Sequence, residues 1–405
     1  MILFTFLGAG SYNETTYTLG EERQVTRYSP AAAAGFLAAK SVTAFLTSEA
    51  EAAHRGGLEK ALPAGCALRC VRIPGGRDEG EFWEIFHILS QEASAAVEEQ
   101  AWDVTHGFRS LPLLTMLALT FLRSGLGIRP TRVLYSLYEK DAETCPMIDL
   151  APMLALMDWA SAADTFSRSG DSRPLASLIN GIRSEYIRGE SRTNEQIQVA
   201  RPVYGLATSL EELSSALALI RPSLVDSSVN WLQDKLPVAE DALKFSPRTR
   251  PLSLLLPRIG QCYQPLVPAD DSVSAHLECR RNLIGWYIER GFYPLAATLE
   301  REWVITWLMS RKGKRALASV IEERESMTKV LNRESDEFVK SKTEPVELAD
   351  IPDYSKLFNI WKKLVEIRND LDHAGMRPQP KSPAAIIAAV EEAFTILKNL
   401  PLEVE

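Results

Sequence analysis

The chain has 405 residues, which exceeds the usual size of a single hydrophobic core and therefore predicts two or three domains. Hydrophobic residues make up 46% of the sequence and charged residues 24%, a composition typical of a soluble globular protein. The formal net charge is -8, which argues against a uniformly basic surface and so against a general polyanion binder. The net charge does not exclude local basic patches.

The cysteines favour neither a disulfide framework nor a zinc site. Their number is odd, only the first two lie close together, and no histidine lies at ligand spacing from that pair. We therefore expect free thiols in a reducing compartment, with no disulfide and no bound metal. The five positions are Cys66, Cys70, Cys145, Cys262 and Cys279.

The opening apolar run covers residues 1–7 and then meets Gly8. It lacks a basic leader region and is too short for a signal peptide or a membrane span. No later segment is apolar over the roughly 18 residues that a span requires. These features predict a cytoplasmic protein without a membrane segment.

The N-terminal part, residues 1–152, alternates short apolar runs with amphipathic stretches, which predicts an α/β unit around a largely parallel, Rossmann-like sheet. Residues 2–7 form the first expected strand, and residues 15–28 read as a hairpin. Ser29 and Pro30 begin an alanine-rich helix that is expected to reach about residue 47. The other expected elements are strands at 67–73, 102–105 and 131–138 and helices at 79–99 and 111–123.

Beyond residue 151 strand signals disappear and apolar residues recur at helical spacing, so the fold class is α/β plus all-α. Five prolines in the stretch 245–272 predict broken helices there, and divide a helical connecting region, 153–270, from a terminal helical bundle, 271–405. The expected helices are 151–166, 174–188, 206–220, 273–290, 294–311, 315–340, 354–372 and 383–398.

Two polar loops lie at the predicted carboxyl edge of the sheet, where open α/β folds bind ligands. One, residues 103–112, lies where a strand ends and a helix begins, and helix N-terminal amides are free to face phosphate there. The other follows the first strand and lacks the full G-x-G-x-x-G pattern, so a nicotinamide-dependent enzyme is set aside. The candidate ligand residues are Gly8, Gly10, Ser11, Tyr12, Asn13, Thr105, His106, Gly107, Phe108, Arg109 and Ser110. In the plainer alternative, Ser110 only caps the following helix and Asp103 only closes a turn.

The segment 366–375 contains Arg-Asn-x-x-x-His, formed by Arg368, Asn369 and His373. At 100° per residue, Arg368 falls on the same helix face as Leu357, Trp361, Leu364 and Leu371, which predicts an arginine within an apolar stripe. In one explanation Arg368 pairs with Glu366 or Asp372 and ties two helices together. In the other, the stripe packs against a second copy and joins two arginines and two histidines in one cleft. Ala374-Gly375 ends the helix, so that His373 can turn toward that seam.

These motifs resemble two families. Arg368-Asn369-x-x-x-His373, together with the helix around 292–303, resembles HEPN ribonucleases. The loop Asp-x-Thr-His-Gly-Phe-Arg-Ser-Leu-Pro, at 103–112, and the Leu-Gly-Ala-Gly-Ser-Tyr start resemble the CARF domains of type III CRISPR ancillary proteins. The resemblance implies a CARF sensor at 1–152 and a HEPN domain at 271–405, in a homodimer or higher homo-oligomer.

The same resemblance implies a function: cyclic oligoadenylate, most often cyclic tetra-adenylate, activates metal-independent cleavage of single-stranded RNA in antiviral defence. No cofactor is implied. Arg368 would stabilise the phosphorane charge, His373 would move a proton and Asn369 would orient one of them, leaving a 2',3'-cyclic phosphate. Whether Thr105, His106 and Arg109 also cleave the activator stays open. The alternative function is a ligand-binding regulator that acts through a partner protein without cutting RNA.

Overall fold

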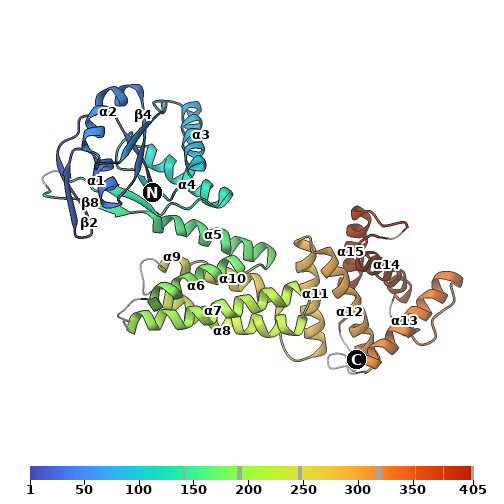
Figure 1. Cartoon of the computed structure of the whole chain (residues 1–405). Helices are drawn as coiled ribbons and strands as arrows, with labels where there is room; N and C mark the ends of the chain where they lie inside the picture. The colour runs from blue at the N-terminus through green and yellow to red at the C-terminus, as the bar shows by residue number, and fades with distance from the viewer. Residues whose placement is uncertain are drawn as a thin grey trace. The chain divides into compact units, whose positions relative to one another are not determined.

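The computed structural model describes residues 1–139, 142–188, 194–244, 249–314, 321–351, 353–376 and 378–402 (Figure 1). Contacts divide the chain into two compact units, Met1–Ala160 and Ser161–Glu405. The first unit is α/β and the second is helical, so the predicted fold class is confirmed. The finer division at residues 152 and 270 stays a prediction.

One eight-stranded sheet organises the first unit, in the order β3-β2-β8-β7-β6-β1-β4-β5. Its centre is parallel, from β7 to β5, while β8 runs antiparallel to β7. β2 and β3 form the expected hairpin at the far edge. The strands are β1 (Ile2–Leu7), β2 (Thr15–Leu19), β3 (Glu22–Thr26), β4 (Ser41–Leu46), β5 (Ala67–Arg72), β6 (Gln100–Asp103), β7 (Arg132–Ser136) and β8 (Cys145–Asp149).

Helices cover both faces of this sheet, which explains why successive residues of the central strands are buried. Phe4 and Trp102 stack on one face, with ring centroids 4.6 Å apart, against α3 (Glu79–Ala95) and α4 (Leu111–Leu126). Leu3 and Val42 point to the other face, which packs on the alanines of α1 (Ser29–Phe36). α2 (Ser48–Ala61) completes the unit (Figure 1).

The expectation of one helix from Ser29 to about residue 47 is wrong. α1 ends at Phe36, Ala38 takes a left-handed backbone with φ of 47°, and residues 41–46 form the buried strand β4. Thr47 then caps α2, accepting a bond from the backbone N–H of Ala50. β4 carries β-branched and aromatic residues and lies between β1 and β5, so pairing on both sides outweighs the helical preference of the alanine-rich segment. The sequence also did not predict α2 or β8.

The second unit is helical throughout its described residues. Its proline-rich stretch is divided into short helices, as expected, and Pro251, Pro257 and Pro265 occupy their first-turn positions, where a missing N–H is tolerated. The predicted start at residue 315 lies outside the described residues. The helices are α5 (Ala151–Ser169), which begins in the first unit, α6 (Arg173–Arg188), α7 (Asn194–Ala218), α8 (Pro222–Lys244), α9 (Arg250–Ser253), α10 (Leu256–Tyr263), the 3-10 helix η1 (Gln264–Leu266), α11 (Val273–Glu289), α12 (Tyr293–Arg311), α13 (Ile321–Ser341), α14 (Tyr354–Asp372) and α15 (Pro383–Lys398).

α12 is the central helix of the terminal bundle and contacts α11, α13, α14 and α15. Its Trp303 and Trp307 rings stack at 6.3 Å, and each indole N–H donates to a backbone carbonyl. The acceptors are Leu277 in α11, at 2.8 Å, and Pro401 after α15, also at 2.8 Å. These bonds tie α12 to α11 and to the segment after α15.

Candidate functional site

The two polar loops of the first unit meet at one sheet edge. β1 and β6 are parallel neighbours, so the loops after Leu7 and Asp103 leave the sheet on the same side. A Cβ placed on Gly8 would lie 3.6 Å from the Cα of Gly107. The structure therefore brings the two predicted loops together, and a ligand at this edge could contact both. Their role in binding stays a prediction.

Asp103 organises this edge from below. Its side chain is fully buried and accepts hydrogen bonds from the hydroxyls of Thr5 at 3.1 Å, Ser29 at 2.7 Å and Thr105 at 2.5 Å. The Thr105 hydroxyl also contacts Ser136 in β7, at 3.0 Å. Three hydroxyls, from β1, α1 and the loop after β6, are thus tied to one carboxylate, so Asp103 does more than close a turn. Thr105 is consequently a positioned residue, held in one orientation beneath the loop.

Tyr12 turns back beneath the first loop. Its hydroxyl accepts a bond from the backbone N–H of Gly8 at 2.8 Å, and its ring lies 4.8 Å from His54 and 4.2 Å from His106. His54 Nε2 lies 2.8 Å from the carbonyl oxygen of Gly10. Tyr12 and His106 therefore support the loop from inside. Gly10, Ser11 and Asn13 are exposed and face solvent.

His54 and Tyr28 belong to this cluster and were missed by the sequence reasoning. The Tyr28 hydroxyl lies 3.4 Å from His54 Nδ1, and the rings pack edge to face. The sequence could have pointed to His54 only through a prediction of α2, the helix that carries it, and α2 was not predicted. Burial raises the pKa of the Tyr12 hydroxyl. Burial also lowers the pKa of His106, against the opposing effect of Asp103, so His106 is neutral at pH 7.

The second loop has a conformation that requires glycine. Gly107 has φ of 113°, and a Cβ there would lie 2.7 Å from the Cδ1 of Leu111. Phe108 turns inward against Gly76, in the loop after β5, where a Cβ would lie 2.6 Å from its ring. Arg109 is exposed. Ser110 lies at the N-cap position of α4, yet its side chain makes no capping bond, so the plainer alternative for Ser110 is wrong.

The exposed parts of this edge suit an anionic ligand. The start of α4 has no side-chain cap, so the positive end of its helix dipole is available to a phosphate, although the Leu111 N–H already donates to the carbonyl of Phe108 and Pro112 has no N–H. Arg109 adds a full positive charge, and the glycines allow close approach of a ligand to the backbone. The arrangement can hold a phosphodiester between the two loops.

In the terminal bundle, Arg368 lies on the predicted helix face together with Leu357 and Trp361, but in the single chain its side chain is not buried. α14 buries Leu357, Trp361, Leu364 and Ile367, whereas the Arg368 side chain is 46% exposed. Its Nε lies 2.9 Å from a carboxylate oxygen of Asp372. At 100° per residue, Arg368 lies about 20° from Leu357 and Trp361 and about 40° from Leu364, so it continues the buried face at the C-terminal end of the helix, where that face is no longer covered. Asp372 is one of the partners named in the first explanation, but both residues belong to α14, so this pair does not tie two helices together.

His373 lies where α14 ends, as predicted. Ala374 and Gly375 take left-handed backbones with φ of 51° and 70°, and the N–H of Gly375 donates to the carbonyl of Asp370 at 3.0 Å. His373 is exposed just beyond the last helical turn. Asn369 is half-buried, and its carbonyl accepts the His373 N–H at 3.3 Å. Arg368 and His373 are thus both accessible at one end of one helix.

Asp370, within the same motif, was not among the predicted site residues. Its side chain is only 4% exposed, and its carboxylate accepts the backbone N–H of Lys381 at 3.4 Å, just before α15. Asp370 therefore ties the loop after His373 back to α14. In the sequence, only its place directly after Arg368-Asn369 marks Asp370. Its burial indicates that it positions the loop and does not take part in the reaction.

Three further observations bear on cofactors and location. Among the residues that the structure describes, no group of three or more His, Cys, Asp or Glu is arranged to hold a metal ion. All five cysteines are free thiols. No helix within the described ranges is long and apolar enough to cross a membrane. Metal independence of any reaction stays a prediction.

The chain was compared with known proteins. No family model matches it. A CRISPR-associated protein of Methanocaldococcus jannaschii is 25% identical over 161 residues, which cover 38% of this chain. The match spans about a quarter of that relative's length, 24%. Among solved structures, Enterococcus italicus Csm6 bound to cyclic hexa-2'-fluoro-hexa-dAMP aligns with 98% of this chain and 92% of its own, with a TM-score of 0.41 and 11% identity. The resemblance of this sequence to CRISPR-associated proteins is thereby confirmed.

Proposed function

We propose that the chain is a single-stranded RNA endoribonuclease that a cyclic oligoadenylate activates, with a CARF sensor in the first unit and a HEPN site in the terminal bundle. The observation that carries the proposal is the end of α14. Arg368 and His373, five residues apart, are both exposed where left-handed Ala374 and Gly375 stop the helix. The similarity to a CRISPR-associated protein supports a role in CRISPR defence, and the type III setting is part of the proposal.

Exposed Arg and His side chains suit cleavage of RNA by its own ribose. The 2'-hydroxyl attacks the adjacent phosphorus, the bond to the 5'-oxygen breaks, and the product carries a 2',3'-cyclic phosphate. Arg368 stabilises the charge that develops on the phosphoryl oxygens. His373 transfers a proton near neutral pH, and Asn369 orients the loop that carries it. This chemistry needs no metal ion and no cofactor.

The proposal needs a second copy, because one chain supplies a single Arg368 and a single His373. In the first unit, α4 presents an apolar stripe at i, i+4 and i+8: Leu113 is 68% exposed, Leu117 57% and Phe121 51%. The stripe begins just after the second polar loop. A two-fold axis through α4 would therefore bring two ligand edges together, which suits a cyclic ligand that has rotational symmetry of its own.

The test is cleavage of a fluorescent single-stranded RNA in EDTA, with cyclic tetra-adenylate, with cyclic hexa-adenylate, and without either. We expect activator-dependent cutting by the wild type and loss of at least about 100-fold in Arg368→Ala and in His373→Ala. Matched controls are Arg258→Ala and His87→Ala, which alter exposed side chains elsewhere. Equal activity in all five proteins would contradict the assignment of this site.

The Arg368–Asp372 ion pair favours a second candidate, a regulator whose terminal helices contact a partner protein and cut nothing. In that reading Arg368 serves only to stabilise the helix. The two candidates differ in one outcome: a regulator binds the cyclic nucleotide but leaves RNA intact under every condition above. Binding without cleavage in a purified homo-oligomer would therefore favour the regulator.

A further inference from the structure

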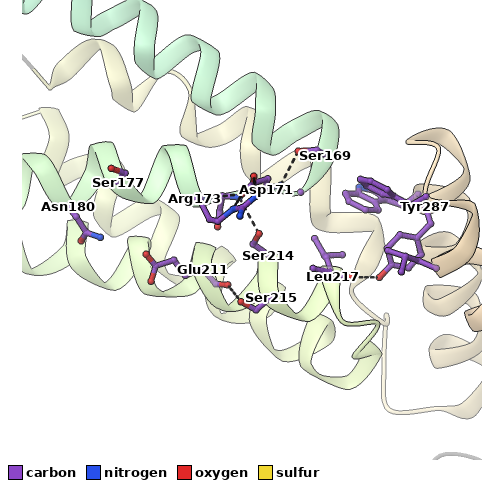
Figure 2. Close-up of a pocket in the computed structure, with 16 residues that line it drawn as sticks. Ser169, Asp171, Arg173, Ser177, Asn180, Glu211, Ser214, Ser215, Leu217 and Tyr287 are labelled. Carbon is purple, nitrogen blue, oxygen red and sulfur yellow. Dashed lines mark hydrogen bonds and ion pairs between the residues drawn. The ribbon is translucent and has the colours of Figure 1, made fainter. Parts of the chain in front are cut away.

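The helical unit contains a pocket of about 900 Å³ that the proposed function does not use. It lies where the turn between α5 and α6 faces α7 and the junction of α11 and α12. In Figure 2, Ser177 and Asn180 project from α6, and Glu211 projects from the neighbouring α7. The volume lies within the range of small-molecule sites, which is about 300–1,000 Å³.

Three residues that line this pocket have buried polar side-chain atoms without hydrogen-bond partners in the described part of the chain. Ser172 is fully buried, Trp286 is 6% exposed, and neither the Ser172 hydroxyl nor the Trp286 indole N–H has a hydrogen-bond partner within the described part of the chain. The buried Oδ1 of Asn180 is also unpaired. Buried polar groups without partners are destabilising, and natural proteins leave few of them. Three around one cavity indicate that a ligand supplies the missing bonds.

The charges of the pocket select the kind of ligand. Asp171 is neutralised by Arg173, whose guanidinium lies 2.6 Å from its carboxylate. Glu211 is exposed and has no ion-pair partner among the residues that the structure covers, so it leaves one uncompensated negative charge on the rim. A phosphate would be repelled there, whereas an amino group would be attracted to Glu211 and to the Asn180 acceptor.

The opposite wall is apolar and is formed by Leu217, Ala218, Phe292 and Leu295. A ligand that fits must therefore place an amino group at one end and an apolar or aromatic body at the other. A polyamine carries charge along its whole length and would bring an ammonium group against this wall. We propose that the pocket binds an amino-substituted nucleoside or heteroaromatic ring without a phosphate, with the amino group on Glu211 and Asn180.

Isothermal titration of the 405-residue chain with adenosine and inosine tests this directly, because inosine replaces the amino group with a carbonyl and carries a hydrogen on the adjacent N1. We expect adenosine to bind at least about tenfold more tightly than inosine, since the lost bond involves a charged acceptor. Adenosine monophosphate should bind more weakly than adenosine. Equal binding of the two nucleosides, tighter binding of the monophosphate, or no adenosine binding would each overturn the proposal, as would spermidine binding as tightly as adenosine.

Variants locate the binding in this pocket. Glu211→Gln should weaken adenosine about tenfold, and Ser177→Trp should block it, while Glu212→Gln, which makes the same charge change one residue along α7, should have no effect. Arg109→Ala, in the N-terminal loops, should also leave adenosine binding unchanged. Loss in Arg109→Ala, or retention in both pocket variants, would move the site elsewhere. RNA cleavage is not a readout here, so failure of the proposed nuclease activity leaves the test intact.

Discussion

Glu300 offers the sharpest test of the energetics of the terminal bundle. Its side chain lies fully buried in α12, and neither carboxylate oxygen has a hydrogen-bond partner among the described residues. Burial raises the pKa of Glu300 well above its ordinary value, so the folded protein holds the proton that the unfolded chain releases. The folded state is therefore favoured at low pH and loses stability as pH rises.

The magnitude follows from linkage. Above the unfolded pKa of about 4.3 and up to the folded pKa, Glu300 lowers the free energy of unfolding by at most about 1.4 kcal/mol per pH unit. Glu300→Gln abolishes this dependence. Glu300→Met also removes the unpaired buried group, which should stabilise the bundle by about 1–3 kcal/mol at pH 5 and by more at pH 7.

The assay is denaturant or thermal unfolding of wild type and variants between pH 5 and 8. Subtracting the curve of each variant from that of the wild type cancels the other titrating groups. Glu289→Gln, whose side chain is 77% exposed, is the control and should show no pH-dependent difference. A difference between wild type and Glu300→Gln that stays flat with pH, or a Glu300→Met protein less stable than wild type, would refute the reasoning.

Four further predictions concern the two sites and the assembly. Asp372→Asn should change the free energy of unfolding by no more than about 0.5 kcal/mol, because both partners of the ion pair are exposed. The same change should raise activator-dependent cleavage about twofold by releasing Arg368, and a complete loss of cleavage would contradict this. Gly107→Ala should abolish activator binding in a titration, since the Cβ meets Leu111, whereas Gly20→Ala, also at positive φ but facing open space, should bind normally. Burial lowers the pKa of His106, so the free energy of unfolding of the wild type should fall as pH drops below about 6.5, by at most about 1.4 kcal/mol per pH unit until the folded pKa is reached. In unfolding experiments, His106→Asn should not show this decrease. Leu117→Glu should convert dimers to monomers, as measured by light scattering, whereas Val97→Glu, which changes a side chain that is 97% exposed, should leave the dimer intact. A dimer that persists in Leu117→Glu would exclude α4 from the interface.

Local pattern was sufficient for much of this fold. Apolar runs of strand length identified β1, β5, β6 and β7, and helical periodicity identified α11, α12, α14 and α15 close to their observed bounds. The glycine pair 374–375 located the end of α14 and hence the exposure of His373. These features depend on residues within one or two turns of one another, which is why sequence alone could determine them.

Tertiary structure decided the rest. Residues 41–46 follow an alanine-rich segment, and only pairing between β1 and β5 makes them a strand. His54 reaches Gly10 because α2 packs beside the first loop, a contact between distant segments that no local pattern encodes. Arg368 lies on the predicted helix face but is exposed, because the neighbouring helices determine how far along α14 that face is covered. Sequence periodicity thus determined which elements form, while burial and long-range pairing determined which side chains they bring together.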